Sequence, residues 1–419
     1  MLRGRGMSVG SDDMKAKSRD FPRFQDRQTV LRQSRNSKMA GSAHAYMRGN
    51  TLKFYEWLKT AKGTLPQGPP IWICGDCHVG NLGPTADADG KISVQIRDFD
   101  QTVIGNPAHD LIRLGLSLAT AARGSDLPGV TTAKMIEQLI EGYEEGLGGD
   151  GKDGDIRRRR PQSVQIAMKR AVGRKWAHLA KERIEDASPT VPLGKRFWPL
   201  TKKEKGEISE LFGREEVRRL VTSLRSRKSD APVEVLDAAY WVKGCSSLGR
   251  LRYAALIGVG KDHSKEGALC LMDIKEAVQA AAPRHARARM PRDNAARIVE
   301  GARHLSPALG DRMLPAGLLG QQVVLRELRP QDLKLEIDQL TPEEAMKAAR
   351  FLAVVVGKAH ASQLDEPSRA KWRDELSRHH STSLDAPSWL WSSIVELMAV
   401  HEAAYLEHCR RYATDPGTP

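Results

Sequence analysis

Three oxygen-bearing side chains in the first quarter of the chain have the types and the spacing to bind metal and phosphate. Asp76 and Asn81 are separated by four residues, and Asp98 follows a short apolar run and precedes Phe99. Carboxylate and amide oxygens are the ligands that a hard cation such as Mg²⁺ prefers. Phosphoryl transfer from ATP needs a base near the acceptor hydroxyl and oxygen ligands for Mg²⁺, with little covalent chemistry from the protein. Residues 71–115 are therefore predicted to form the phosphate- and metal-handling part of a site.

The same residues resemble the motifs of known phosphotransferases. Protein kinases space the base Asp and the metal-binding Asn as D-x-x-x-x-N and carry a D-F-G motif further on. A longer resemblance, to the aminoglycoside phosphotransferase and choline kinase group, rests on three stretches: Gly75-Asp76-x-His78-x-Gly80-Asn81, Asp98-Phe99-Asp100 and Gly105-x-Pro107-x-x-Asp110-Leu111. From about Ala43 to His360, the chain resembles the bacterial family catalogued as domain of unknown function DUF2252, which implies no particular reaction.

The resemblance implies a role for each matching residue. Asp76 would be the catalytic base, and Asn81 and Asp98 would be the Mg²⁺ ligands. Asp110 would be a structural residue at a helix start. Asp100 stands where D-F-G has its glycine, so its role is open between a second metal ligand and a substrate contact.

A second set of residues could cover and anchor a nucleotide. Gly244 and Gly249 have the outer spacing of G-x-G-x-x-G, and Ser246 stands at its middle position. Two predicted strands flank this turn, and a third ends at Lys275, the position at which kinases place a phosphate-binding lysine. In the helix predicted next, Glu300 is the candidate for an ion pair with Lys275. We expect ATP and Mg²⁺ as cofactors.

The order of these parts is reversed relative to ordinary kinases, because the glycine turn and Lys275 follow the Asp76 segment. Either the second match is accidental or the domain is circularly permuted. Chain ends lie on surfaces, where new termini are tolerated, so a permutation is mechanically feasible. Residues 343–360 resemble the kinase helix that normally precedes the catalytic loop. A permuted chain therefore requires this helix to pack beside residues 71–74.

The expected fold is α+β and kinase-like, with two lobes. The parts are a basic, flexible leader (1–40), a helical lobe with the catalytic and metal-binding loops (41–230), a small β-rich nucleotide-binding lobe (231–335) and C-terminal helices completing the helical lobe (336–419). Apolar periodicity predicts the elements. The strands are at 71–74, 92–96, 233–242, 251–259, 268–274 and 323–328, and the helices at 43–59, 111–122, 131–147, 294–305, 342–362 and 386–411.

Composition limits the setting and the partners. The chain has 66 Lys and Arg against 52 Asp and Glu, a net charge of +14, which favours anionic partners such as nucleotides. No apolar run approaches the length of a membrane span, and the N-terminus lacks the apolar segment of a secretory signal. Five cysteines, an odd number, indicate a reducing compartment without a disulfide framework. We expect a cytoplasmic protein without a membrane partner.

Several alternatives compete with the phosphotransferase hypothesis. Cys74-Gly-Asp-Cys77-His78 also matches C-x-x-C-H, a haem attachment motif, but that motif requires export and leaves Asn81 and Asp98 unexplained. A zinc site from the same residues lacks a second ligand pair. A catalytically inactive, nucleotide-binding regulatory protein remains possible. A nucleic-acid-binding protein is less favoured, because no aromatic residues are interleaved in the basic run 157–160. The acceptor, an unidentified hydroxyl on a small molecule or protein, and the oligomeric state stay open.

Overall fold

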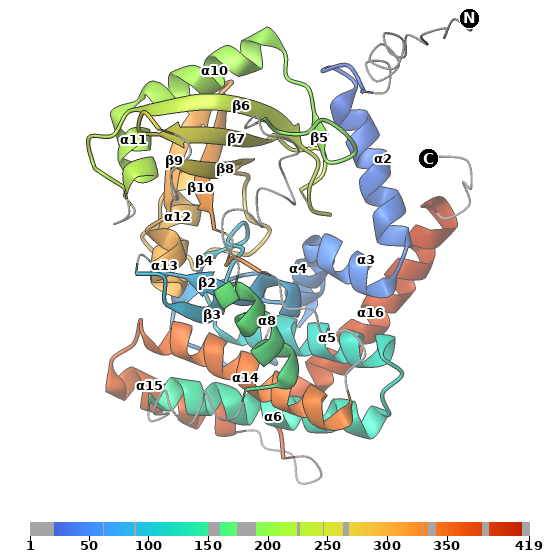
Figure 1. The fold of residues 1–419 in the computed structure, drawn as a ribbon. Helices are drawn as coiled ribbons and strands as arrows, with labels where there is room; N and C mark the ends of the chain where they lie inside the picture. Colours follow the sequence, from blue (N-terminus) through green and yellow to red (C-terminus); the bar gives the residue numbers. More distant parts are fainter. Residues whose placement is uncertain are drawn as a thin grey trace, which may run out of the picture.

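The computed structural model describes residues 21–61, 63–87, 89–149, 160–173, 190–223, 227–245, 247–262, 268–329, 331–333, 341–378 and 385–412. These form a mixed α+β fold, which confirms the expected class at that level. One half is built around an antiparallel sheet, and the other half is mainly helical (Figure 1). We call them the sheet half and the helical half.

The sheet half contains a six-stranded antiparallel sheet with the order β5-β6-β7-β8-β10-β9. Its alternating, β-branched and aromatic segments are typical of strands. Lys275 at the end of β8 stands opposite Arg252 of β7 and Val324 of β10. The strands are Phe197–Trp198 (β5), Val233–Trp241 (β6), Arg252–Val259 (β7), Leu269–Glu276 (β8), Met313–Leu318 (β9) and Gln321–Leu328 (β10).

Two helices between β5 and β6 cover one face of the sheet (Figure 1). In α10 (Lys202–Gly213) and α11 (Glu215–Thr222), the apolar residues fall on one side and share a buried cluster with β6, β7 and β8. These two helices belong to the range predicted as the helical lobe (41–230), and their apolar side closes the sheet.

Helix α12 (Asn294–Leu305) and the short α13 (Pro307–Gly310) connect β8 with β9. Asp293 caps α12 by accepting from the Ala296 backbone N–H, as the sequence pattern favours. The buried side of α12 belongs to the main core of the helical half. The helix therefore connects the two halves.

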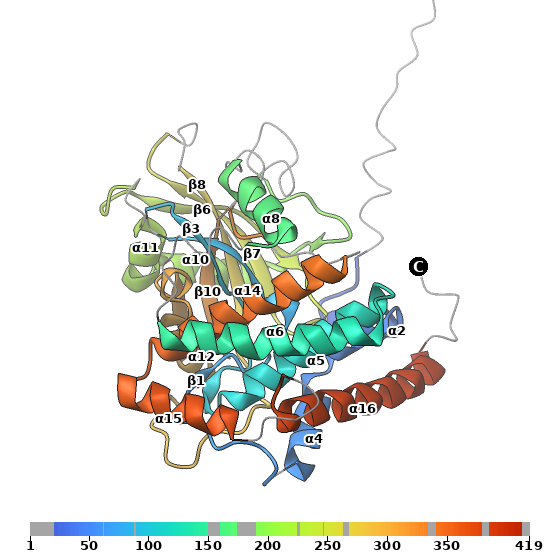
Figure 2. The ribbon, with the colours of Figure 1, turned by 90° about the horizontal axis from the view of Figure 1, so that it is seen from below.

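The helical half packs its longest helices against one another. Figure 2 shows α6 and α14 lying side by side, with α5 next to α6. Glycines at Gly142, Gly146 and Gly357 allow the α6 and α14 backbones to approach, because a Cβ at any of them would strike the other helix. The helices of this half are Ala43–Gly49 (α3), Thr51–Thr60 (α4), Ala108–Gly124 (α5), Gly129–Gly148 (α6), Gln162–Gly173 (α8), Pro342–Ala361 (α14), Glu366–Ser377 (α15) and Ser388–Tyr412 (α16).

Two small strand pairs lie between the sheet and these helices. Strand β1 (Ile71–Ile73) pairs with β4 (Val103–Gly105), and β2 (Leu82–Ala86) pairs with β3 (Ile92–Ile96). The strands predicted from the sequence do not include Leu82–Ala86, which forms β2 because β3 supplies its backbone partners. The two pairs hold the segments 74–81 and 97–102 at the same end of the helical half.

The N-terminal prediction is wrong for part of the leader. Residues Arg27–Ala40 form helix α2, which runs beside α16 (Figure 1). Its Arg27 side chain is buried in an ion pair with Glu204 of α10, at 2.7 Å. Leu31 is buried with the apolar residues of the sheet half. A polar, basic helix is thus fixed by a few inward-facing residues.

None of the helices in the described ranges is both long enough and apolar enough to cross a membrane.

Candidate active site

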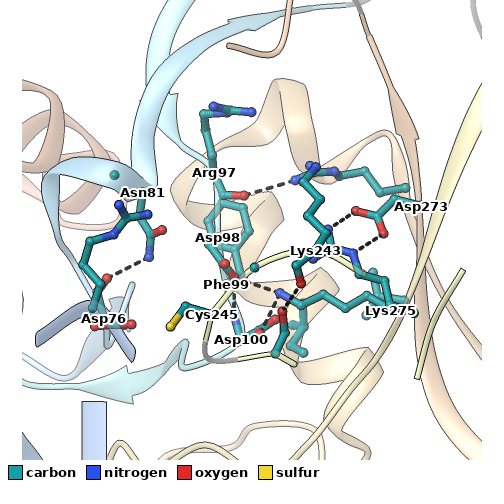
Figure 3. A pocket seen from close by; sticks show the side chains of 18 of the residues that line it. Asp76, Asn81, Arg97, Asp98, Phe99, Asp100, Lys243, Cys245, Asp273 and Lys275 are labelled. Atoms are coloured by element: carbon teal, nitrogen blue, oxygen red, sulfur yellow. Dashed lines mark hydrogen bonds and ion pairs between the residues drawn. The ribbon is translucent and has the colours of Figure 1, made fainter. Parts of the chain in front are cut away.

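A cavity of about 390 Å³ lies where the two halves meet. Its walls come from the segments 76–81 and 97–100, from the turn 243–247, and from β7, β8, β9, β10 and α12. A volume of this size is typical of small-molecule sites. Figure 3 shows Asp76 and Asn81 on one side of the cavity, Asp98 and Asp100 in the middle, and Lys275 on the other side.

Asp76 is held by groups from three directions. One carboxylate oxygen accepts from Arg113 Nε at 2.7 Å, and the other accepts from Thr51 Oγ1 at 2.8 Å. Its backbone carbonyl accepts from the Asn81 side-chain amide at 3.0 Å. The Arg113 side chain is fully buried and Asp76 is 13% exposed, so the pair opens to the cavity only through the carboxylate. Asp76 is therefore positioned before any ligand arrives.

Gly75 shapes the turn that presents Asp76. Its φ is +74°, a left-handed conformation that glycine adopts without steric cost. A Cβ at this position would strike the Gln101 carbonyl oxygen. The sequence Cys74-Gly75-Asp76 thus allows the chain to leave β1 sharply and to pass close to the Asp98 segment.

Asp110 fixes the same turn from below. Its two oxygens accept from the backbone N–H groups of Cys74 and Gly75, at 2.7 and 2.9 Å. His360 Nε2 lies 3.2 Å from Asp110, and His360 Nδ1 lies 2.9 Å from the Tyr143 hydroxyl. All of these side chains are buried. The tautomer of His360 with hydrogen on Nε2 fits this network of hydrogen bonds, because Nε2–H donates to Asp110 and Nδ1 accepts from the Tyr143 hydroxyl.

This network places the end of α14 against β1. Gln363, just after the helix, accepts from the Trp72 backbone N–H at 2.9 Å and donates to the Trp72 carbonyl at 3.0 Å. The end of the 343–360 helix therefore lies beside 71–74, as the permutation hypothesis requires.

Lys275 connects the two predicted halves of the site. Its Nζ lies 2.6 Å from Asp100 Oδ2 and 3.4 Å from Asp98 Oδ1 (Figure 3). Partial desolvation opposes ionisation of Asp98, but the Lys275 ammonium outweighs it and holds the pKa of Asp98 below its usual range. Burial and the neighbouring Asp98 carboxylate raise the pKa of Asp100. The two acids thus have different protonation behaviour around one lysine.

The predicted ion pair between Glu300 and Lys275 does not form. Both residues are described, and Lys275 pairs with Asp98 and Asp100 instead. Helix α12 presents Arg297 toward the site, where it donates to the backbone carbonyls of Asp100 and Thr102. The rotation of α12 turns Arg297 inward and leaves Glu300 half-buried. The sequence left the role of Asp100 open, and in the structure Asp100 forms an ion pair with Lys275.

The glycine turn lies at the edge of the cavity. Gly244 and Gly249 have φ values of +94° and +93°, which explains glycine at both ends. Gly244, Cys245 and Ser247 line the cavity. Ser246 lies outside the described residues. These three residues of the turn therefore form part of the cavity wall.

Several cavity residues were missed in the sequence. Arg252 Nε donates to Asp273 Oδ1 at 2.9 Å, and both side chains are nearly buried. Burial opposes ionisation of Asp273, but Arg252 outweighs it and lowers its pKa to about 2. Asp273 precedes Lys275 by two positions on β8, so strand alternation places both on one face, a signal that could have identified it. Arg48, Arg97 and Arg326 also line the cavity. Arg97 directly precedes the Asp98-Phe99 motif, whereas Arg48 and Arg326 stand outside the motifs found in the sequence.

The cysteines beside Asp76 are buried packing residues here. Cys74 and Cys77 are free thiols with no exposed surface. A hydrogen bond with Cys77, together with burial, raises the pKa of Cys74. Across the described residues, no group of three or more His, Cys, Asp or Glu side chains is arranged to hold a metal ion. A kinase-like Mg²⁺ site takes part of its ligands from nucleotide phosphates, so it does not require such a group.

The comparisons place the chain in a family without indicating an activity. A family model described as "Uncharacterized protein conserved in bacteria (DUF2252)" matches residues 27–411. The match spans most of the chain, so the chain belongs to this family, as the sequence resemblance predicted. Neither the curated proteins nor the solved structures give a match. The function must therefore be argued from the geometry of the cavity.

Proposed function

We propose that this chain is an Mg²⁺- and ATP-dependent phosphotransferase with a circularly permuted kinase-like fold, acting on a hydroxyl acceptor. The observation that carries the proposal is the meeting of Lys275 with Asp98 and Asp100. Lys275 follows Asp98 by 177 positions, yet its Nζ lies 3.4 Å from Asp98 Oδ1. Kinase chemistry needs a lysine and a metal-binding aspartate at the same phosphates.

The order of elements supports the permutation. From β6, the chain passes through the glycine turn, β7, the lysine strand β8, helix α12 and the pair β9–β10. In kinases a glycine-rich turn, a lysine strand and a helix occur in this order before the catalytic loop. Here the equivalent of that loop follows β1, near the chain start, and α14 from the chain end packs beside β1.

The residues present fit a magnesium–nucleotide complex. The Asp98 side chain is 41% exposed, and the Asn81 amide nitrogen donates to Asp76, leaving the Asn81 oxygen without a hydrogen bond from described residues. Asn81 and Asp98 would hold the ion together with phosphate oxygens. Bound Mg²⁺ supplies charge neutralisation at the transferring phosphate. Lys275, held by Asp100, would face the non-transferring phosphates.

Asp76 is proposed to orient the acceptor hydroxyl. Arg113 and Thr51 fix its carboxylate, and one face of Asp76 remains open to the cavity. The transition state of phosphoryl transfer is loose in most analyses, so positioning contributes more than a strong base. Asp76 would accept the hydroxyl hydrogen bond and then the proton, as the acceptor oxygen bonds to the γ-phosphorus of ATP and the bond from that phosphorus to the ADP oxygen breaks.

A nucleotide screen tests the proposal. Purified protein is heated with ATP, GTP, CTP or UTP, with and without Mg²⁺, and the unfolding temperature is recorded. A ligand that binds only the folded state stabilises it by mass action, so ATP with Mg²⁺ should raise the unfolding temperature. Asp98→Asn should lose most of this rise, whereas Asp311→Asn, at an exposed position, should keep it. The absence of any Mg²⁺-dependent rise with all four nucleotides would contradict the proposal.

A further inference from the structure

Three basic side chains lie near Cys245, which lines the cavity. Arg35 and Lys38 lie on α2 and Arg48 lies on α3. All three act electrostatically on Cys245 in the glycine turn, where burial raises the thiol pKa and their charges oppose the rise. In the chain as described, none of the three forms an ion pair with an acid. Within the described ranges, therefore, no ion pair neutralises their positive charge.

Arg48 is the member of this group that lines the cavity. Its guanidinium lies against Gly80, because a Cβ at Gly80 would stand 2.8 Å from Arg48 Cζ and Nη2. Its Nε is buried and makes no hydrogen bond. Arg35 Nε is also buried without a partner. Buried donors in native proteins are normally satisfied, so these two guanidinium groups point to a missing acceptor.

The other arginines of the cavity form hydrogen bonds with the protein, although Arg326 Nε is also buried without a partner. Arg252 pairs with Asp273, and Arg97 donates to the backbone carbonyls of Asp332 and Leu333. Arg326 donates to the Arg97 carbonyl at 3.1 Å. These cations help to build the wall. The described residues, by contrast, supply no ion-pair partner for Arg48.

We propose that Arg48 binds an anionic group of the acceptor, a phosphate or a carboxylate, and that Arg35 and Lys38 add positive charge nearby. The inference rests on the proposed function, because it makes Asp76 the partner of the acceptor hydroxyl. Arg48 contacts Gly80, four residues after Asp76 in the same segment, whereas Lys275 and Asp98 mark the side expected to hold the nucleotide. A guanidinium matches the geometry of a carboxylate or phosphate.

The expected acceptor differs in charge from those of the aminoglycoside phosphotransferase and choline kinase group, which the motifs of this chain resemble. Aminoglycosides and choline carry positive charge. The Arg48 guanidinium, close to the Asp76 segment that would bind the acceptor hydroxyl, would repel them. An acceptor that carries both a hydroxyl and an anionic group suits the cavity better.

The experiment compares acceptors that differ in charge. Glycerol, glycerol 3-phosphate, glycerate and choline are each incubated with the protein, ATP and Mg²⁺, and ADP release is measured. Inorganic phosphate is titrated separately by thermal shift, with and without ADP and Mg²⁺. The variants are Arg48→Gln, Gly80→Ala, which displaces the Arg48 guanidinium, and the control Arg32→Gln at an exposed position of α2.

We expect the phosphate or carboxylate compound to stimulate ADP release more than glycerol or choline. Arg48→Gln and Gly80→Ala should raise the KM for that compound by about tenfold to a hundredfold, the value of one or two charge-assisted hydrogen bonds. Arg32→Gln should leave the KM unchanged. The affinity for ADP with Mg²⁺ should be the same in Arg48→Gln and in the unsubstituted protein.

Three outcomes would overturn the inference. The first is preferential stimulation by choline or glycerol, and the second is a KM that Arg48→Gln does not change. The third is an equal loss of nucleotide affinity in Arg48→Gln, which would assign Arg48 to the nucleotide. If no nucleotide binds at all, the proposed phosphotransferase fails. The anion site is then judged by inorganic phosphate alone: stabilisation that Arg48→Gln abolishes supports it, and no stabilisation rejects it.

Discussion

At the scale of single residues, the contact between Asp76 and Arg113 links stability with the proposed chemistry. Arg113 is fully buried, and its Nε donates to Asp76 while Nη2 donates to the Met47 carbonyl at 2.8 Å. A buried guanidinium without a counter-charge is costly, because its desolvation is no longer compensated. Asp76 therefore holds the arginine as much as the arginine holds Asp76.

Asp76→Asn should lower the free energy of unfolding by about 3 kcal/mol, the usual cost of breaking a buried ion pair. The rate of phosphotransfer should fall as well, when it is measured without denaturant at a temperature where the variant is folded. Urea unfolding monitored by circular dichroism gives the stability. Asp374→Asn, at an exposed position, serves as the control. A variant as stable as the parent would show that the Asp76–Arg113 pair contributes little.

At the scale of elements, Asp110 joins α5, β1 and α14 through one carboxylate. It accepts from two backbone N–H groups, and His360 Nε2 lies 3.2 Å away. An asparagine at this position would offer only one acceptor oxygen. Its NH₂ group would face one of the two backbone N–H donors, which would then lack an acceptor. The geometry of the Asp76 turn consequently depends on a residue that touches no ligand.

Asp110→Asn should destabilise the fold by about 1–3 kcal/mol, the cost of leaving a buried donor unsatisfied. The comparison is Asp365→Asn at the N-cap of α15, where asparagine caps as well as aspartate. Urea unfolding of both variants should separate them. Equal stabilities would indicate that the buried network adapts to the amide.

Elements were predictable from sequence to different degrees. The bounds of α12 match the predicted helix at 294–305, and β3 matches its predicted strand, because apolar periodicity and a capping Asp293 define them locally. The ion-pair partner on α12 was not predictable. Arg297 and Glu300 are three positions apart, so only the packing of the helix decides which of them faces the site. The pairing of Lys275 with Asp100 depends on that same packing.

At the scale of the whole molecule, α2 connects the sheet half with the helical half. Arg27 pairs with Glu204, which also accepts from the Tyr253 hydroxyl at 3.0 Å. The same helix carries Arg35 and Lys38 to the edge of the cavity. Composition marked this segment only as polar and basic, since a helix fixed by a few buried contacts leaves a weak periodic signal.

Glu204→Gln should lower the free energy of unfolding by about 3–5 kcal/mol, because it leaves Arg27 charged and buried. The exposed pair Arg123–Glu402 provides the contrast, since both side chains are largely in water. Glu402→Gln should change stability by less than about 1 kcal/mol. Denaturant unfolding of the two variants tests this difference, and equal effects would argue against a stabilising role for the α2 contact.

Three histidines whose pKa values are lowered by desolvation should make the protein sensitive to acid. Burial lowers the pKa of His78 and His401 to about 3 and that of His109 to about 4. Their contribution is fully present above the ordinary histidine pKa of about 6.5. Below that pH the unfolded chain binds protons that the folded chain does not. The free energy of unfolding therefore decreases as the pH falls toward the pKa values of these histidines in the folded state.

We expect the free energy of unfolding to decrease between pH 7 and pH 5. His401→Leu should reduce the slope by up to about 1.4 kcal/mol per pH unit, because it removes one such group. His304→Leu, at an exposed position, is the control. Denaturant unfolding at several pH values measures the slope. A slope that His401→Leu does not change would assign the acid sensitivity to other groups.

The overall arrangement was only partly accessible from the sequence. The motif around Asp76 and the lysine at the end of β8 were visible, since motif spacing is local. The place of α10 and α11 on the sheet was not, because their charged sides dominate the composition and the sheet face they cover is formed by later residues. The unpaired charge of Arg48 is likewise a property of packing, which no linear pattern records.

The most direct test of the central claim asks which lysine lies at the nucleotide phosphates. An acyl phosphate of ATP acylates a lysine amine close to its phosphates and releases ATP, and mass spectrometry identifies the labelled residue. The permuted kinase-like site predicts labelling at Lys275, suppressed by excess ATP with Mg²⁺. Lys202, exposed on α10 away from the cavity lining, should show no comparable protection. Labelling that ATP protects at another lysine and not at Lys275 would contradict the account.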